Sequence, residues 1–120
     1  MTHGPKPKMA IDKAAKNTTI RGTVLNISRM PGFFTDLLLF TGTQVVFIRV
    51  MRIRTHECDP KEIEWMFKEV IHGLRNVPLS PVVCREIHVL APWGAWQYFR
   101  IDDDRVIEVR RDGSPLITAK

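Results

Sequence analysis

The chain has 120 residues and a formal net charge of +5, with 44% hydrophobic and 26% charged residues. This length fits one compact domain, because two folded domains would each be marginally stable, and the composition excludes a largely disordered chain. No apolar run approaches the roughly 18 residues that a membrane span requires, so we expect no membrane association.

Most of the positive charge lies near the N-terminus. Residues 1–8 contain one glycine and two prolines, which predict a disordered basic arm. Residues 1–21 contain one acid, Asp12, and five basic residues: Lys6, Lys8, Lys13, Lys16 and Arg21. Such a segment can contact phosphates without sequence preference, or it can be a solvated end that keeps the protein soluble.

Two cysteines, Cys58 and Cys84, are too few for a disulfide framework. The N-terminal lysines are not followed by the apolar segment of a secretory signal. We therefore expect a cytoplasmic protein whose thiols are reduced.

Apolar patterning predicts the elements of the first half of the chain. Helix-forming residues predict a short helix over 9–17, and alternating apolar residues predict a strand over 19–29. Residues 33–41 contain the apolar block LLLF, which predicts a central strand covered on both faces. Residues 44–54 predict the second strand of a hairpin, joined to the first through a turn at Gly42.

The second half is predicted to begin with a helix at Asp59, an N-cap that is followed by Pro60 and Glu62 in the first turn. Three further strands are predicted over residues 82–90, 95–101 and 104–110. The helix between two strands implies a crossover and therefore a parallel pair. We expect one α/β domain over residues 9–111, with a mixed central sheet flanked by helices, and a loose tail over 112–120.

A bend, an aspartate and an apolar hairpin follow one another in a specific order. The segments are the bend Pro31-Gly32-Phe33-Phe34-Thr35-Asp36, the strand Leu37 to Phe40, the strand 47–52 and a late aromatic strand at 96–99. This order resembles the PD-(D/E)XK nuclease fold, in particular its archaeal Holliday-junction-resolvase-like branch. The resemblance implies a restriction-endonuclease-like fold and a homodimer.

In that family an Asp and a Glu hold a divalent metal, and a Lys orients the attacking water. Asp36 matches the first acid, but Arg49 occupies the position of the Glu and Met51 that of the Lys. A guanidinium cannot coordinate Mg²⁺ and a thioether is a poor ligand for it, so we expect no metal cofactor and no catalytic residue here. The hairpin should bring Arg49 to Asp36 as a bidentate ion pair in place of the metal; the alternative is that Arg49 extends to solvent.

The expected nucleic-acid contacts are the five basic residues near the N-terminus together with Arg29, Arg52 and Arg54. In the predicted fold these three arginines flank the degenerate cleft and face a phosphate backbone, although strand-edge charge against aggregation is the other interpretation. Trp65 lies on the polar face of the predicted helix, where it is either a candidate interface residue or a lone surface aromatic.

Zinc-type ligands occur in two places, at His56 and Cys58 and at Cys84 and His88. Their spacing matches no zinc motif, and on one strand Cys84 and His88 would lie about 13 Å apart. We therefore predict buried cysteines and surface histidines instead of a metal site.

The sequence thus predicts a catalytically inactive nuclease-like domain that binds nucleic acid through its basic arm and degenerate cleft, as a homodimer without a small-molecule substrate. Two alternatives stay open. One is an endonuclease that uses Mg²⁺ or Mn²⁺ with displaced acids such as Glu57 or Glu86. The other is a purely structural or partner-binding subunit.

Overall fold

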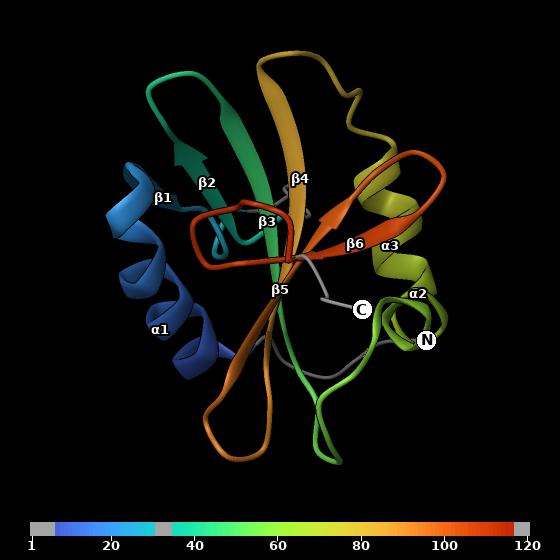
Figure 1. Ribbon diagram of the computed structural model, residues 1–120. Helices are drawn as coiled ribbons and strands as arrows, with labels where there is room; N and C mark the ends of the chain where they lie inside the picture. The colour runs from blue at the N-terminus through green and yellow to red at the C-terminus, as the bar shows by residue number, and fades with distance from the viewer. Residues whose placement is uncertain (1–6, 31–34, 117–120) are drawn as a thin grey trace.

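A computed structural model describes residues 7–30 and 35–116 of the chain and confirms an α/β domain. Its centre is a six-stranded sheet in the order β1-β2-β3-β4-β5-β6, with helices on both faces (Figure 1). The strands are β1 (Thr23–Asn26), β2 (Leu37–Phe40), β3 (Val45–Arg52), β4 (Val83–Leu90), β5 (Trp96–Ile101) and β6 (Val106–Val109). The helices are α1 (Lys8–Thr18), α2 (Pro60–Met66) and α3 (Lys68–Arg75), with a 3₁₀ turn at Thr19–Arg21.

The sheet is mixed, as predicted. β3 and β4 pair in parallel, and the other neighbouring strands pair antiparallel. The helices α2 and α3 connect the end of β3 to the start of β4, and this crossover lets the two strands run in the same direction. The predicted hairpin of β2 and β3 is also present, with Leu37 opposite Ile48.

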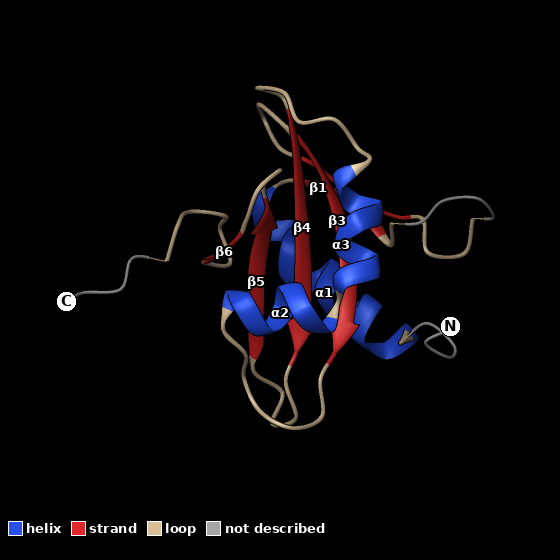
Figure 2. Cartoon of the chain, turned by 90° about the vertical axis from the view of Figure 1, so that its right-hand side faces the viewer, coloured by secondary structure: helices blue, strands red, loops and turns tan. Residues whose placement is uncertain are grey.

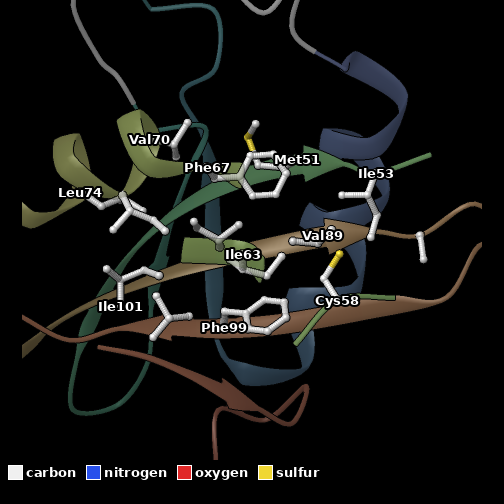
Figure 3. Close-up of a cluster of buried hydrophobic side chains, with 14 residues drawn as sticks. Met51, Ile53, Cys58, Ile63, Phe67, Val70, Leu74, Val89, Phe99 and Ile101 are labelled. Carbon is white, nitrogen blue, oxygen red and sulfur yellow. The ribbon is translucent and has the colours of Figure 1, made fainter. Parts of the chain in front are cut away.

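Two helical layers cover the two faces of the sheet (Figure 2). On one face, α1 packs Ala10, Ile11 and Ala14 against apolar residues of β2 and β3. On the other face, α2 and α3 contribute Ile63 and Leu74 to a second apolar cluster with β3, β4 and β5 (Figure 3). Each large apolar side chain buried in this way stabilises the fold by about 1.5–3 kcal/mol, so both helical layers are held by the sheet core.

The second layer begins where the sequence predicts it. The Asp59 carboxylate accepts a hydrogen bond from Glu62 N at 2.8 Å, and the Glu62 side chain accepts one from Asp59 N at 3.0 Å. The expected single helix is nevertheless interrupted at Phe67 (φ −111°, ψ 35°), and α2 and α3 run in different directions across the sheet (Figure 2). Phe67 is buried, so the break lets both segments place their apolar residues on a twisted surface.

Two parts of the first half differ from expectation or fall outside the description. The 3₁₀ turn takes up the start of the predicted strand 19–29, so β1 has only four residues. Residues 1–6 of the predicted arm and residues 31–34 of the predicted bend lie outside the described residues. Over the described ranges, no helix is both long enough and apolar enough to span a membrane.

The C-terminal segment is more ordered than predicted. Arg110 N donates to Ser114 O at 2.8 Å, and Leu116 N donates to Glu108 O at 3.1 Å. A turn therefore folds residues 110–116 back along β6, and Gly113 supplies its positive φ of 91°. We call this segment the C-terminal turn.

Candidate nucleic-acid interface and the Asp36–Arg49 pair

Asp36 and Arg49 form the ion pair that the sequence predicts. Arg49 Nε lies 3.4 Å from Asp36 Oδ2, and the two side chains are 19% and 2% exposed. The same carboxylate oxygen accepts a hydrogen bond from Val50 N at 2.8 Å. The Nε–Oδ2 distance exceeds the about 2.7–2.9 Å of a charge-assisted hydrogen bond, and the bidentate geometry stays a prediction. Arg49 does not extend to solvent.

The residues around Asp36 do not fit a divalent metal. Met51, which the predicted resemblance aligns with a lysine, is buried in the α2–α3 cluster near Phe67 (Figure 3). Alternation along β3 places Arg49 on this same face of the sheet, so these two positions hold a guanidinium and a thioether. Asp36 belongs to no group of three potential ligands among the residues that the structure describes. Among the described residues, a hard cation at Asp36 therefore finds no set of oxygen ligands.

Glu86 and Glu57, the acids of the endonuclease alternative, form no group of metal ligands with Asp36 among the described residues. Glu86 shares its face of β4 with Cys84 and Leu90, which pack in the α1-side cluster. Asp36, through Arg49, lies on the α2–α3 face, so the sheet separates the two carboxylates. Glu57 is exposed in the loop after β3 and joins no group of ligands with Asp36 within the described part of the chain.

Glu86 instead anchors a buried polar network on the α1 side. Its two oxygens accept hydrogen bonds from Arg21 Nη1 and Nη2 at 2.8 and 2.9 Å. His88 Nε2 lies 2.8 Å from Glu86 Oε1. The rings of Tyr98 and His88 pack edge to face, with their centroids 4.8 Å apart. Burial by itself raises the pKa of Glu86, but the hydrogen bonds and charges of His88 and Arg21 outweigh it and lower the pKa to about 2.

This network changes the interpretation of Arg21. The sequence places it among the phosphate contacts, but its side chain is 9% exposed and its guanidinium is held by Glu86. The pairing partner lies 65 residues away, so no local pattern could predict it. Arg21 therefore has a structural role as the partner of Glu86, and its contact with nucleic acid stays a prediction.

A basic pocket lies next to Arg21, and residues of the 3₁₀ turn, the β2–β3 turn and the C-terminal turn line it. Its volume is about 590 Å³ and it is open to solvent. The lining residues are Ile20, Arg21, Thr41, Thr43, Gln44, Arg110, Arg111 and Asp112. Arg110 and Arg111 are exposed. Neither was predicted as a site residue, although two consecutive arginines stand at the end of the last predicted strand.

The other predicted basic residues do not converge on one surface. Lys13 and Lys16 are exposed on α1, whose C-terminal end leads into the basic pocket. Lys8 is exposed but forms an ion pair with Asp12 at 3.2 Å, and Lys6 lies outside the described residues. The remaining three, which are exposed near the far end of the sheet, are Arg29, Arg52 and Arg54.

The distance along β3 explains this division. The strand begins beside the basic pocket and ends at Arg52, about 23 Å away for eight residues. Arg29 follows β1, which runs in the same direction as β3, and so lies toward the same end as Arg52 and Arg54. The predicted set thus consists of two separate basic regions.

Aromatic residues are divided between surface and core. Trp65 is 80% exposed on α2, as predicted, while its role in a homodimer interface stays a prediction. Trp96 and Tyr98 stack on one face of β5 with ring centroids 6.5 Å apart, and Phe99 is fully buried on the other face. Tyr98 and Phe99 are therefore packing residues and are not available for base stacking.

No protein-family model matches this chain, and no curated protein or solved structure is significantly similar to it.

Proposed function

We propose that this domain binds nucleic acid without cutting it, through the basic pocket and the exposed side of α1. The observation that carries the proposal is the composition of the pocket. Arg110 and Arg111 supply cations, and Thr41, Thr43 and Gln44 supply hydroxyl and amide donors. These are the groups that contact phosphate oxygens, and such contacts position a nucleic acid without reading its sequence.

The exposed side of α1 extends the positive surface. Lys13 and Lys16 project from the helix that leads into the pocket, and neither forms an ion pair within the described residues. Cations that replace condensed counterions on a phosphate backbone gain affinity that falls with salt. We therefore infer sequence-tolerant, salt-sensitive binding of nucleic acid. The buried Arg21–Glu86 pair supports the surface on which it takes place.

The proposal includes a restriction-endonuclease-like fold with a lost catalytic centre. Support comes from the order α1, β1 to β3, crossover helices and parallel β4, together with Asp36 at the head of β2. Arg49 supplies the cation beside Asp36, so one carboxylate remains where metal-assisted phosphodiester cleavage needs several oxygen ligands.

Replacing Arg110 and Arg111 together by alanine is expected to weaken binding to all oligonucleotide sequences alike. Each lost phosphate contact reduces the slope of log K against log salt by about one, so the double variant should lose about two. Fluorescence anisotropy with labelled duplex DNA, single-stranded DNA and RNA, from about 50 to 200 mM salt, measures the slope. Arg105→Ala is the matched control, because Arg105 is an exposed arginine of the β5–β6 turn that does not line the pocket. An equal loss in both variants, or no salt-dependent binding by the wild type, would contradict the proposal and favour a structural subunit.

No cleavage is expected when supercoiled plasmid or a four-way DNA junction is incubated with the full chain and Mg²⁺ or Mn²⁺. The reason is the protein cation beside Asp36 and the placement of Glu86 on the opposite face of the sheet. Gel electrophoresis of the products gives the readout, with Asp36→Asn as the companion variant. Cleavage by the wild type that disappears in Asp36→Asn would restore the endonuclease alternative.

A further inference from the structure

Three side chains at the start of α2 bring different metal-ligating atoms together. His56, Cys58 and Glu62 offer a nitrogen, a sulfur and an oxygen that all lie within 4.8 Å of one another. His56 Nε2 and Glu62 Oε2 are only 3.1 Å apart. The two Cys–His pairs of the sequence do not form one four-ligand site, because Cys84 packs on the α1 side and Cys58 on the α2–α3 side. The third ligand atom beside His56 and Cys58 comes from Glu62.

Two of the three groups are held in position by separate contacts. The side-chain amide of Gln97, on β5, accepts a hydrogen bond from Cys58 N at 2.9 Å and donates one to Cys58 O at 2.8 Å. Glu62 Oε1 accepts from Asp59 N in the capping box, which directs Oε2 toward His56. The His56 side chain is 60% exposed and belongs to a loop, so it is free to adjust.

The local charge favours a cation. Residues 57–64 contain four acids and one lysine, in a chain whose net charge is +5. Burial, followed by the charges of Glu62 and Asp59, raises the pKa of the Cys58 thiol. An acidic segment of this kind attracts a cation by its charge.

We propose that His56 Nε2, Cys58 Sγ and Glu62 Oε2 bind one Zn²⁺ ion, with a fourth position open to water or an added ligand. Zinc bonds of about 2.0–2.3 Å place tetrahedral ligands about 3.3–3.8 Å apart, so each atom has to move by less than about 1 Å. A mixed nitrogen, sulfur and oxygen set suits Zn²⁺, whereas Mg²⁺ and Ca²⁺ prefer oxygen alone. The site is separate from the basic pocket, so it does not depend on nucleic-acid binding.

Titration of the reduced full-length protein with Co²⁺, a spectroscopic substitute for Zn²⁺, tests this site. We expect one equivalent to produce a thiolate-to-cobalt charge-transfer band and tetrahedral d–d bands, which Zn²⁺ then removes by competition. Cys58→Ser should abolish the charge-transfer band, and His56→Ala should weaken Zn²⁺ binding by at least about tenfold. Matched controls are Cys84→Ser for the thiol and His72→Ala for an exposed histidine.

The result that overturns the proposal is a protein that binds no Co²⁺ with a thiolate band, or a band that survives Cys58→Ser. A band lost in Cys84→Ser but retained in Cys58→Ser would overturn it as well. Because Cys58 is buried, circular dichroism must show that Cys58→Ser is folded. If that variant does not fold, His56→Ala decides, since this exposed side chain contributes little to the core. Unchanged Zn²⁺ affinity in His56→Ala then refutes the site.

Discussion

Replacing Glu86 by glutamine is expected to destabilise the domain by about 3–5 kcal/mol, because it leaves the Arg21 guanidinium buried beside a neutral group. The Glu86 side chain is 2% exposed, and its two oxygens bind Arg21 while one of them also contacts His88. Few other single substitutions in this chain would remove a charge with so many buried partners. Urea unfolding at neutral pH, followed by circular dichroism, measures the change in the free energy of unfolding.

The same substitution should reduce the sensitivity of the fold to acid. The pKa of Glu86 in the folded chain is about 2, below its ordinary value of 4.5. A carboxyl with a depressed pKa stabilises the fold fully above its ordinary pKa, and this contribution is lost as the pH falls through 4.5 toward 2. The loss is on the order of 3 kcal/mol in the wild type and absent in Glu86→Gln.

Glu69→Gln is the control for this pH series, because Glu69 is an exposed carboxylate on α3. It should follow the wild type at every pH. If Glu86→Gln and the wild type lose stability equally between about pH 5 and pH 2, the Arg21–Glu86 pair is not the acid-sensitive element.

The pair also connects the core to the proposed binding surface. At Gly113 in the C-terminal turn, an added Cβ would lie 2.6 Å from Arg21 Nη2, so the guanidinium packs against the backbone of this turn. The turn carries Arg110 and Arg111 into the basic pocket. We infer that Glu86 positions these arginines indirectly, by holding Arg21 beneath them.

The second large effect is expected at Asp36 and Arg49. Arg49→Ala should lower the free energy of unfolding by about 2–3 kcal/mol, because it removes the guanidinium from a carboxylate that is 2% exposed. Asp36→Asn together with Arg49→Ala should cost less than the sum of the two single variants, with a coupling energy of about 1–3 kcal/mol. Urea unfolding of the four proteins in this double-mutant cycle gives the coupling energy directly.

Arg52→Ala is the matched control for the cycle. Arg52 is an exposed arginine on the same strand, and its removal should change stability by no more than about 0.5 kcal/mol. Strict additivity at Asp36 and Arg49 would show that the guanidinium does not compensate the carboxylate. The prediction that a protein cation compensates Asp36 would then be wrong.

These features divide the molecule by the two faces of its sheet. The α1 side holds the Glu86 network, beside which lies the basic pocket, and it is the side that we propose for nucleic acid. The α2–α3 side holds the Asp36–Arg49 pair and, at the start of α2, the proposed zinc ligands. The two proposals can therefore be tested independently, since a variant at one site leaves the other face of the sheet intact.

Interactions between residues near one another in the chain were predictable. The capping box joins Asp59 and Glu62, three residues apart, and the β2–β3 hairpin joins residues that a short turn brings together. The Asp36–Arg49 contact follows from the register of that hairpin, which is why its presence could be predicted, though its distance could not. Local propensity and a fixed strand period carry this information directly.

Contacts between distant parts of the chain were decided only by tertiary packing. Arg21 pairs with Glu86 across 65 residues, and Gln97 fixes Cys58 across 39. The break at Phe67 and the position of Arg110 at the basic pocket likewise depend on where whole elements settle against the sheet. The partner of a buried charge is fixed only when the chain is compact, because a charge that loses its water in the core needs an opposite charge beside it.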